Sequence, residues 1–316
     1  MYSKYLQKIL SITGNHTVNI NLDLSTVPSA YLLSPSQAGA IQAAFLSNRP
    51  LLVRGDPGLG KSQLAYAIAS ILNWGVVKAV VQYNTTVESL LYDVDHIERL
   101  HFANLQTQSN QDLSVIRFLK PGKIWQAIAP NSFDDLSSEL NLPENNKHKK
   151  PHDKEGTVLL IDEIDKADSS LPNALLDVLD TGEISCPYVN FAIKASQEKH
   201  PYMVVVTSNE ERLLPMAFIR RCAILDLTLD DKSQLMAIFE AHKTRDEKLN
   251  KLSEELAEQV ADFIFEQRGK NDKDYKPGTS EFLDMLRALS QFDEGEREAK
   301  LTTLQQHLIV KNQQRN

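Results

Sequence analysis

The sequence is poor in cysteine and has no long apolar run. Cys186 and Cys222 are the only cysteines among 316 residues. Neither belongs to a CxxC pair or has a histidine at metal-ligand spacing, so we expect no zinc site and no disulfide framework. The longest apolar runs, such as residues 157–161 and 203–206, have the length of a strand, whereas a membrane helix needs about 18 apolar residues. We therefore expect no membrane span and a cytoplasmic protein.

A basic excess is also missing. The chain has 34 Lys and Arg against 42 Asp and Glu, which gives a net charge of -8. Proteins held on nucleic acid mainly through phosphate contacts are usually basic, so this balance argues against a nucleic-acid partner. It does not exclude a local basic patch. Hydrophobic residues at 42% and charged residues at 24% are ordinary globular values, and the length suits two domains of unequal size.

The glycines that do occur include a complete phosphate-binding pattern. Residues 55–62 read Gly-Asp-Pro-Gly-Leu-Gly-Lys-Ser and match G-x-x-x-x-G-K-[ST] at every fixed position. An apolar run at 51–53 predicts a strand before the loop, and apolar residues at helical spacing predict a helix after it. The glycines allow successive backbone N–H groups to turn toward an anion. Lys61 can then reach the β and γ phosphates, and Ser62 offers a hydroxyl to Mg²⁺.

This pattern predicts that the chain binds a nucleoside triphosphate together with Mg²⁺. The alternative is a degenerate loop that no longer binds nucleotide. The residues expected at the nucleotide are Gly55, Asp56, Pro57, Gly58, Leu59, Gly60, Lys61, Ser62 and Gln63.

Two carboxylates end a second apolar strand. Residues 158–161 read Val-Leu-Leu-Ile and run directly into Asp162 and Glu163. In a sheet that also carries the phosphate loop, Asp162 is placed to hold Mg²⁺ through its water shell and Glu163 to polarise the attacking water. A solvated acidic turn is the alternative. If Glu163 is the base, the chain hydrolyses its nucleotide and does not merely hold it.

Polar residues also follow the next strand. Asn209 comes after the apolar run at 202–206, where its amide can orient water beside the γ phosphate; an ordinary turn is the alternative. Arg220 and Arg221 end a short helix predicted at 215–219. An exposed arginine there can reach the phosphate of a neighbouring subunit, or it can be a surface residue without a partner. The first interpretation predicts an oligomer.

The order of the elements predicts the fold. From residue 230 onward the pattern is helical, so a smaller all-helical domain is expected to follow a sheet domain. Before residue 230, predicted strands alternate with predicted helices. This alternation indicates an α/β fold with a mostly parallel sheet covered on both faces. Ligands of such sheets bind at the carboxyl ends of the strands. The predicted strands are residues 51–53, 76–81, 158–161, 202–206 and 223–227.

The second and third strands are separated by about 75 residues, far more than a normal crossover. We therefore expect an insert around 86–156. Its polar end at 141–156 predicts a mobile surface loop, with a basic contact patch at Lys147–Lys150 as the alternative. The predicted domains are an irregular leader at 1–34, a nucleotide-binding domain at 35–229, and a helical lid domain with a polar tail at 230–316.

Four segments then occur together in one order. They are residues 49–55, which lead into the phosphate loop, 160–167 with Leu-Ile-Asp-Glu-Ile-Asp-Lys-Ala, 207–209 with Thr-Ser-Asn, and 218–222 with Phe-Ile-Arg-Arg-Cys. With these motifs, residues 34–289 resemble the MoxR branch of AAA+ ATPases. The resemblance implies a five-stranded AAA+ core with a helix-2 insert and a helical lid. It further implies a hexameric ring with ATP and Mg²⁺ bound between subunits, and a hairpin around 191–199.

The resemblance also implies a role for each motif residue. Arg221 is the preferred arginine finger because it directly precedes Cys222, where relatives have an Arg followed by Phe or Cys; Arg220 stays a candidate. The Walker A pair is then Lys61 and Ser62, the Walker B pair is Asp162 and Glu163, and sensor 1 is Asn209.

The lid departs from the family pattern. Relatives often carry a sensor 2 arginine at the start of a lid helix, and here Glu281 or Phe282 stands near that place. Either this arginine is absent or Lys276 or Arg287 substitutes for it.

The resemblance also bears on partners. Members of this branch commonly work with a separate von Willebrand A-type protein, remodel or mature protein complexes or insert metal cofactors, and some belong to bacterial conflict or defence systems. The favoured hypothesis is therefore an ATP-hydrolysing ring that remodels a protein client. The alternatives are a nucleotide-gated signalling or binding module with slow turnover, and a nucleic-acid-directed AAA+ motor.

Overall fold

A computed structural model describes most of the chain. Its described residues are 2–12, 16–20, 29–105, 114–139, 152–189, 193–270 and 276–309. The chain forms two compact units whose segments interleave along the sequence. The first unit comprises Met1–Ser11, Ala40–Leu52 and Ile71–Ile224, and the second comprises Ile12–Gly39, Val53–Ser70 and Leu225–Asn316. The domain bounds predicted at 1–34, 35–229 and 230–316 stay a prediction.

A five-stranded sheet has the strand order β11-β3-β10-β7-β4. β7 pairs in parallel with β4 on one side and with β10 on the other. Every residue of β7 and all but the first of β10 are buried, as expected for strands covered on both faces. The predicted α/β fold with a five-stranded parallel sheet is confirmed. The strands are β3 (Leu51–Arg54), β4 (Gly75–Val80), β7 (Thr157–Asp162), β10 (Tyr202–Ser208) and β11 (Ala223–Asp226).

Helices of the first unit cover this sheet with large apolar side chains. Trp125 of α6 (Lys123–Ile128) and Phe218 of α9 (Met216–Ile219) are fully buried, in one cluster with Ile161. That cluster includes residues of α8 (Ser170–Thr181) as well. Burial of side chains of this size stabilises a fold by about 1.5–3 kcal/mol each, so the sheet and these helices form one core.

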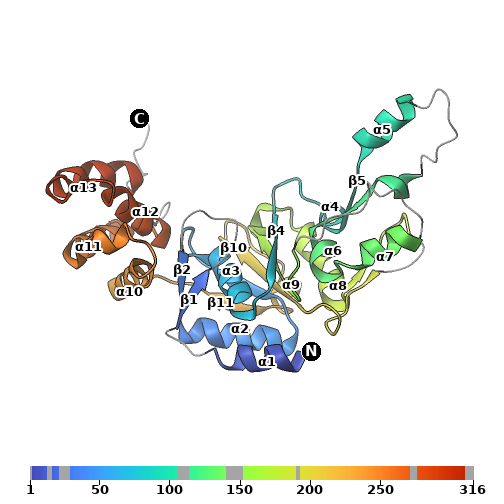
Figure 1. Ribbon diagram of the computed structural model, residues 1–316, viewed down its shortest axis with the longest axis horizontal. Helices are drawn as coiled ribbons and strands as arrows, with labels where there is room; N and C mark the ends of the chain where they lie inside the picture. Colours follow the sequence, from blue (N-terminus) through green and yellow to red (C-terminus); the bar gives the residue numbers. More distant parts are fainter. Residues whose placement is uncertain are drawn as a thin grey trace. The chain divides into compact units, whose positions relative to one another are not determined.

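The amino-terminal residues are not an irregular leader. Residues Tyr2–Leu10 form helix α1, which lies beside α2 (Pro35–Ser47) (Figure 1), and a Gln42 side-chain amide on α2 donates to the Ile9 carbonyl. In the second unit, β1 (His16–Ile20) pairs antiparallel with β2 (Ser29–Leu33). The predicted irregularity is wrong for residues 2–10, 16–20 and 29–33, which form one helix and two strands.

The chain between β4 and β7 contains several short elements. β5 (Tyr92–Val94) pairs antiparallel with β6 (Leu119–Pro121), and Figure 1 shows α5 extending from β5 away from the sheet. The Lys147–Lys150 patch and residues 141–151 of the predicted loop lie outside the described residues. The helices here are α4 (Val87–Leu91), α5 (His96–Leu105), η1 (Val115–Phe118), α6 and α7 (Ser132–Glu139).

A hairpin precedes β10. It consists of β8 (Glu183–Ile184) and β9 (Ile193–Lys194), which pair antiparallel. The region predicted for it, 191–199, begins with residues 191 and 192, which lie outside the described residues.

After the last strand of the sheet, the chain continues in the second unit as a series of helices, as predicted. Asp231 caps α10 by accepting a hydrogen bond from the Ser233 N–H. Phe239, Phe282 and Leu286 are fully buried in the core of this helical part. The tail at 312–316 lies outside the described residues. The helices are α10 (Lys232–Lys243), η4 (Leu249–Lys251), α11 (Glu254–Lys270), α12 (Thr279–Leu289) and α13 (Glu294–Leu308).

His242 on α10 is a buried titratable group, only 5% exposed. Burial and, after it, the charge of Arg287 lower the pKa of His242 to about 4, although Asp246 and a hydrogen bond to the backbone of Ala30 act in the opposite direction. Its Nδ1 atom has no partner among the described residues. The folded protein therefore holds this imidazole neutral at pH 7.

We expect the free energy of unfolding to fall as the pH drops from about 6.5 to about 4, because the unfolded chain protonates His242 in this window and the folded chain does not. Between pH 7 and pH 5 this amounts to about 2 kcal/mol. Urea unfolding at both pH values should show a smaller loss for His242→Gln than for the wild type. The exposed His307 on α13 provides the control, since His307→Gln should keep the full loss; equal losses in all three proteins would contradict the prediction.

Candidate functional site

The phosphate loop, residues 55–60, lies in the second unit between β3 and helix α3 (Lys61–Leu72). Gly55, Gly58 and Gly60 have φ values of 139°, 78° and 84°, a region that side chains other than glycine adopt only with strain. A Cβ on Gly55 would lie 2.3 Å from the carbonyl oxygen of Leu227. The observed loop backbone therefore requires glycine at these three positions.

Lys61 begins α3 and turns back over the loop. Its side chain is largely buried, with 7% of the residue exposed, and its Nζ donates to the carbonyl oxygens of Gly55 at 2.7 Å and Asp56 at 2.8 Å. A cation, a turned backbone and the N-terminus of a 12-residue helix meet here. This donor set fits the phosphates of a nucleotide, and the Ser62 hydroxyl follows on the same helix turn.

The helical part of the second unit contacts this loop directly. The Ser280 N–H and hydroxyl both donate to the Gly58 carbonyl, each at 3.0 Å. Arg268 near the end of α11 donates from Nη2 to the Asp56 carboxylate at 3.0 Å and from Nη1 to the Pro277 carbonyl at 2.8 Å. Sequence reasoning missed Arg268, because nothing in the local pattern of α11 distinguishes it from a surface arginine.

The candidates for a sensor 2 residue lie elsewhere or have other partners. Phe282 is fully buried in the helical core. Glu281 accepts from the Gly278 N–H at 2.9 Å and thereby caps α12. Arg287 pairs with Asp246 and Asp284 at 3.8 Å each, and Lys276 is exposed. Arg268, which was not among these candidates, bonds to Asp56 of the phosphate loop.

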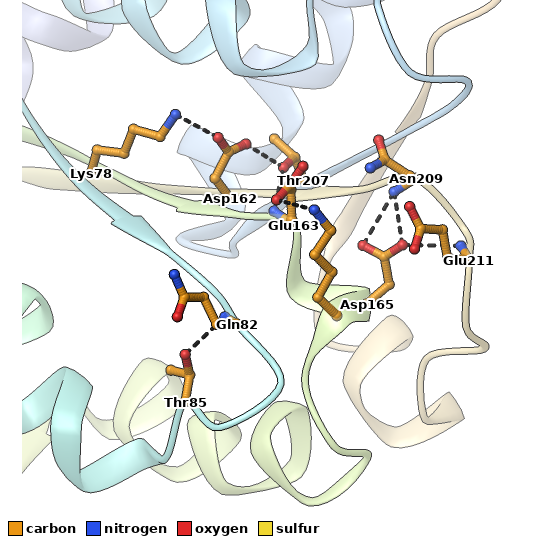
Figure 2. A network of polar contacts seen from close by, with 10 residues as sticks. Lys78, Gln82, Thr85, Asp162, Glu163, Asp165, Thr207, Asn209 and Glu211 are labelled. Carbon is orange, nitrogen blue, oxygen red and sulfur yellow. Dashed lines mark hydrogen bonds and ion pairs between the residues drawn. The ribbon is translucent and has the colours of Figure 1, made fainter. Parts of the chain in front are cut away.

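In the first unit, Asp162 ends β7 as a buried carboxylate, 6% exposed. Lys78 of β4 pairs with it at 2.6 Å, and the Thr207 hydroxyl of β10 donates to it at 2.7 Å (Figure 2). The same Thr207 oxygen accepts from the Glu163 N–H at 2.9 Å. A carboxylate held in this way offers the hard oxygen ligand that Mg²⁺ prefers, so Asp162 fits a role in holding this ion.

Glu163 follows with a left-handed backbone, φ 62° and ψ 47°. Such a conformation is strained for a residue other than glycine and is frequent at functional sites. The Glu163 side chain is 32% exposed and pairs with Lys166 at 2.6 Å. The hydrogen bond with Glu163 is the main cause of a raised pKa of Lys166. Glu163 is therefore turned out of the line of β7, where water can reach it.

Asp165 anchors the chain after β10. It lies in the short 3-10 helix η3 (Ile164–Lys166) and is only 2% exposed. Its two carboxylate oxygens accept from the Asn209 N–H at 3.1 and 3.2 Å and from the Glu211 N–H at 3.0 Å. Figure 2 shows Asp165 and Asn209 facing each other in this network. Asp165 has no role in the predictions from sequence, although a third acidic residue so soon after a strand was a visible signal.

Arg220 and Arg221 follow α9 and are both exposed. The Arg221 Nε pairs with Asp180 of α8 at 2.7 Å. The Arg220 carbonyl accepts from Arg49 at 3.4 Å. The pair therefore lies on the surface, with the Arg220 carbonyl bonded to Arg49 and the Arg221 side chain bonded to α8.

Residues 50–222 match a protein-family model, that of the AAA domain (dynein-related subfamily). The chain belongs to the AAA+ family. The match covers more than half of this AAA+ chain and includes the phosphate loop, the acidic end of β7, Asn209 and the arginine pair. Members of this family bind nucleotide, typically with Mg²⁺, and commonly form oligomeric rings, so the AAA+ and ATPase predictions are confirmed at this general level.

Among solved structures, this AAA+ chain is similar to a protein of Cytophaga hutchinsonii ATCC 33406 described as a "putative ATPase". The identity is 13%, the alignment covers 95% of this chain and 84% of the other, and the TM-score is 0.41. The family assignment depends on the sequence match and not on this likeness. No curated protein matches the sequence significantly. No helix in the described ranges is long and apolar enough to cross a membrane.

We expect Asp165→Ala to lower ATP turnover at least about tenfold, because the Asn209 and Glu211 amides lose a buried charged acceptor and the loop after β10 is released. The Km for ATP should change much less, since the hydrogen bonds of Asp165 hold the chain after β10 and the phosphate loop has its own. Asp165→Asn is the matched control, because it keeps one acceptor oxygen and should lie between Ala and the wild type. Wild-type turnover in Asp165→Ala would contradict this role.

Proposed function

We propose that this AAA+ chain is a MoxR-type ATPase that forms a hexameric ring, hydrolyses ATP and uses the energy to remodel or mature a protein client. The observation that carries the proposal is the arrangement after β7. There Asp162 is buried and compensated, whereas Glu163 is part-exposed and turned outward. A binding module needs only the phosphate loop, but hydrolysis also needs a carboxylate that water can reach.

The proposed division of labour is the one that the family motifs imply for these residues. The loop amides and Lys61 bind the triphosphate, and Ser62 and Asp162 would hold Mg²⁺, which when bound would draw charge from the phosphate oxygens. Glu163 takes a proton from the attacking water, and Asn209 orients that water. Water adds to the γ phosphorus, the bond to the ADP oxygen breaks, and the products are ADP and phosphate.

We expect Glu163→Gln to lower turnover at least about 100-fold while ATP still binds, because the amide keeps the shape but cannot accept the proton. Turnover by phosphate release and binding of a fluorescent ATP analogue measure the two effects separately. Glu211→Gln, a nearby exposed glutamate, serves as the control and should keep turnover. Undiminished turnover in Glu163→Gln would remove Glu163 as the base.

The ring part of the proposal depends on the exposed arginines. Arg221 leaves its partner Asp180 and binds the γ phosphate of the neighbouring subunit instead. Arg220 is the other candidate for this role.

Arg221→Ala should therefore be inactive alone, and mixing it with the inactive Glu163→Gln should restore part of the turnover. In the mixed ring, some sites combine an intact Glu163 with an intact Arg221 from the next subunit. The same mixing with Arg220→Ala decides between the two arginines. Full activity of both single arginine variants would count against a finger supplied in trans.

A client and a partner complete the proposal. We propose a protein complex as the client, with a separate von Willebrand A-type protein as partner and a bacterial conflict or defence system as one setting, in the cytoplasm. Affinity capture with Glu163→Gln in ATP, which holds the ring assembled, tests this. Recovery of a bare monomer would speak against the remodelling ring.

One observation favours the alternative of a slow, nucleotide-gated module. Lys166 pairs with Glu163 at 2.6 Å, and a base occupied by a lysine is less available to water. Turnover that rises in Lys166→Ala and is negligible in the wild type would support that alternative. The net charge of -8 argues against a nucleic-acid-directed motor.

A further inference from the structure

Asp56 of the phosphate loop is held from two directions. Its backbone carbonyl accepts from Lys61 at 2.8 Å, and its carboxylate accepts from Arg268 at 3.0 Å. Lys61 is also the residue expected to bind the nucleotide's phosphates. The hydrogen bonds of one residue therefore connect the phosphate-binding cation to an arginine on α11.

Arg268 is placed to act on more than this one residue. Its side chain is 13% exposed, and its other terminal nitrogen, Nη1, donates to the Pro277 carbonyl at 2.8 Å. Pro277 lies just before α12, whose Ser280 donates twice to Gly58. The planar guanidinium can make both contacts at once, which a lysine cannot do with the same geometry.

Backbone packing makes this contact close. A Cβ on Gly58 would lie 2.6 Å from the Ser280 hydroxyl oxygen, and a Cβ on Gly278 would lie 3.1 Å from the Gly58 carbonyl. The two glycines thus allow the segment before α12 and the loop to touch along their main chains. A change in the loop backbone therefore requires the start of α12 to move with it.

We propose that Arg268 is a positioning residue that holds the phosphate loop in its binding-ready shape and links the start of α12 to nucleotide occupancy. When phosphates engage the Lys61 ammonium, the Asp56 carbonyl loses this donor, and the Arg268 pair keeps Asp56 and the Pro277 segment together. This inference rests on the proposed nucleotide site. It assigns the role to a residue near the end of α11, whereas the arginine that the family resemblance implies stands at the start of a lid helix.

The test is a double-mutant cycle on nucleotide affinity. Binding of a fluorescent, non-hydrolysable ATP analogue with Mg²⁺ is measured for the wild type, Arg268→Gln, Asp56→Ala and the double variant. We expect each single variant to raise the Kd about tenfold and the double variant to be no worse than either single one, because both remove the same ion pair. Arg268→Lys, which can keep only one of the two contacts, should show a smaller rise.

Arg297 provides the matched control. It also makes two hydrogen bonds to backbone carbonyls in the helical part, those of Phe292 and Lys251, and it has no role in the proposal. Arg297→Gln should leave the Kd unchanged, which separates positioning of the loop from general loosening of the helices. Hydrogen exchange at the Ser280 amide should rise in Arg268→Gln and not in Arg297→Gln.

An unchanged Kd in Arg268→Gln, or fully additive effects of Arg268→Gln and Asp56→Ala, would overturn the inference. If Arg268→Gln does not fold, Asp56→Ala still removes the contact from the loop side, where the carboxylate is 41% exposed, and an unchanged Kd there overturns it equally. Absence of nucleotide binding by the wild type would instead refute the proposed function itself.

Discussion

The phosphate loop depends on a backbone path that only glycine follows without strain at three positions. Gly55, Gly58 and Gly60 have positive φ, and the Leu227 carbonyl lies where a Cβ on Gly55 would be. This path lets Lys61 turn back onto the loop's own carbonyls. It also leaves the Gly58 carbonyl open to the two hydrogen bonds from α12. The cation and the helical contact are thus both consequences of the same tight turn.

The carboxylates after β7 differ in their partners, and the difference separates their tasks. Buried carboxylates need a counter-charge or hydrogen bonds. Asp162 has Lys78 and the Thr207 hydroxyl, and Asp165 has main-chain amides. Glu163 is the most exposed of the three. The buried pair is therefore suited to hold an ion and a loop in place, and Glu163 is suited to react.

The strands predicted from local pattern are confirmed. Apolar runs such as residues 158–161 predict strands reliably here, because a strand in the middle of a parallel sheet is buried on both faces. The phosphate loop was evident because its geometry requires glycine at fixed spacing. The residues 2–10 were misjudged, because their helix depends on burial of Tyr5, whose ring packs edge-on against Trp74 at 5.0 Å, a contact between distant segments.

The sequence by itself determined the fold class, the AAA+ motifs and which residues carry the candidate chemistry, because each of these depends on local spacing and on residue type. Only the tertiary structure decided which side chains act together. Arg268 reaches a residue 212 positions earlier in the chain, and Asp165 reaches amides more than forty positions later. Such pairs arise from chain folding, and a partner at that distance leaves no periodic or compositional mark on either segment.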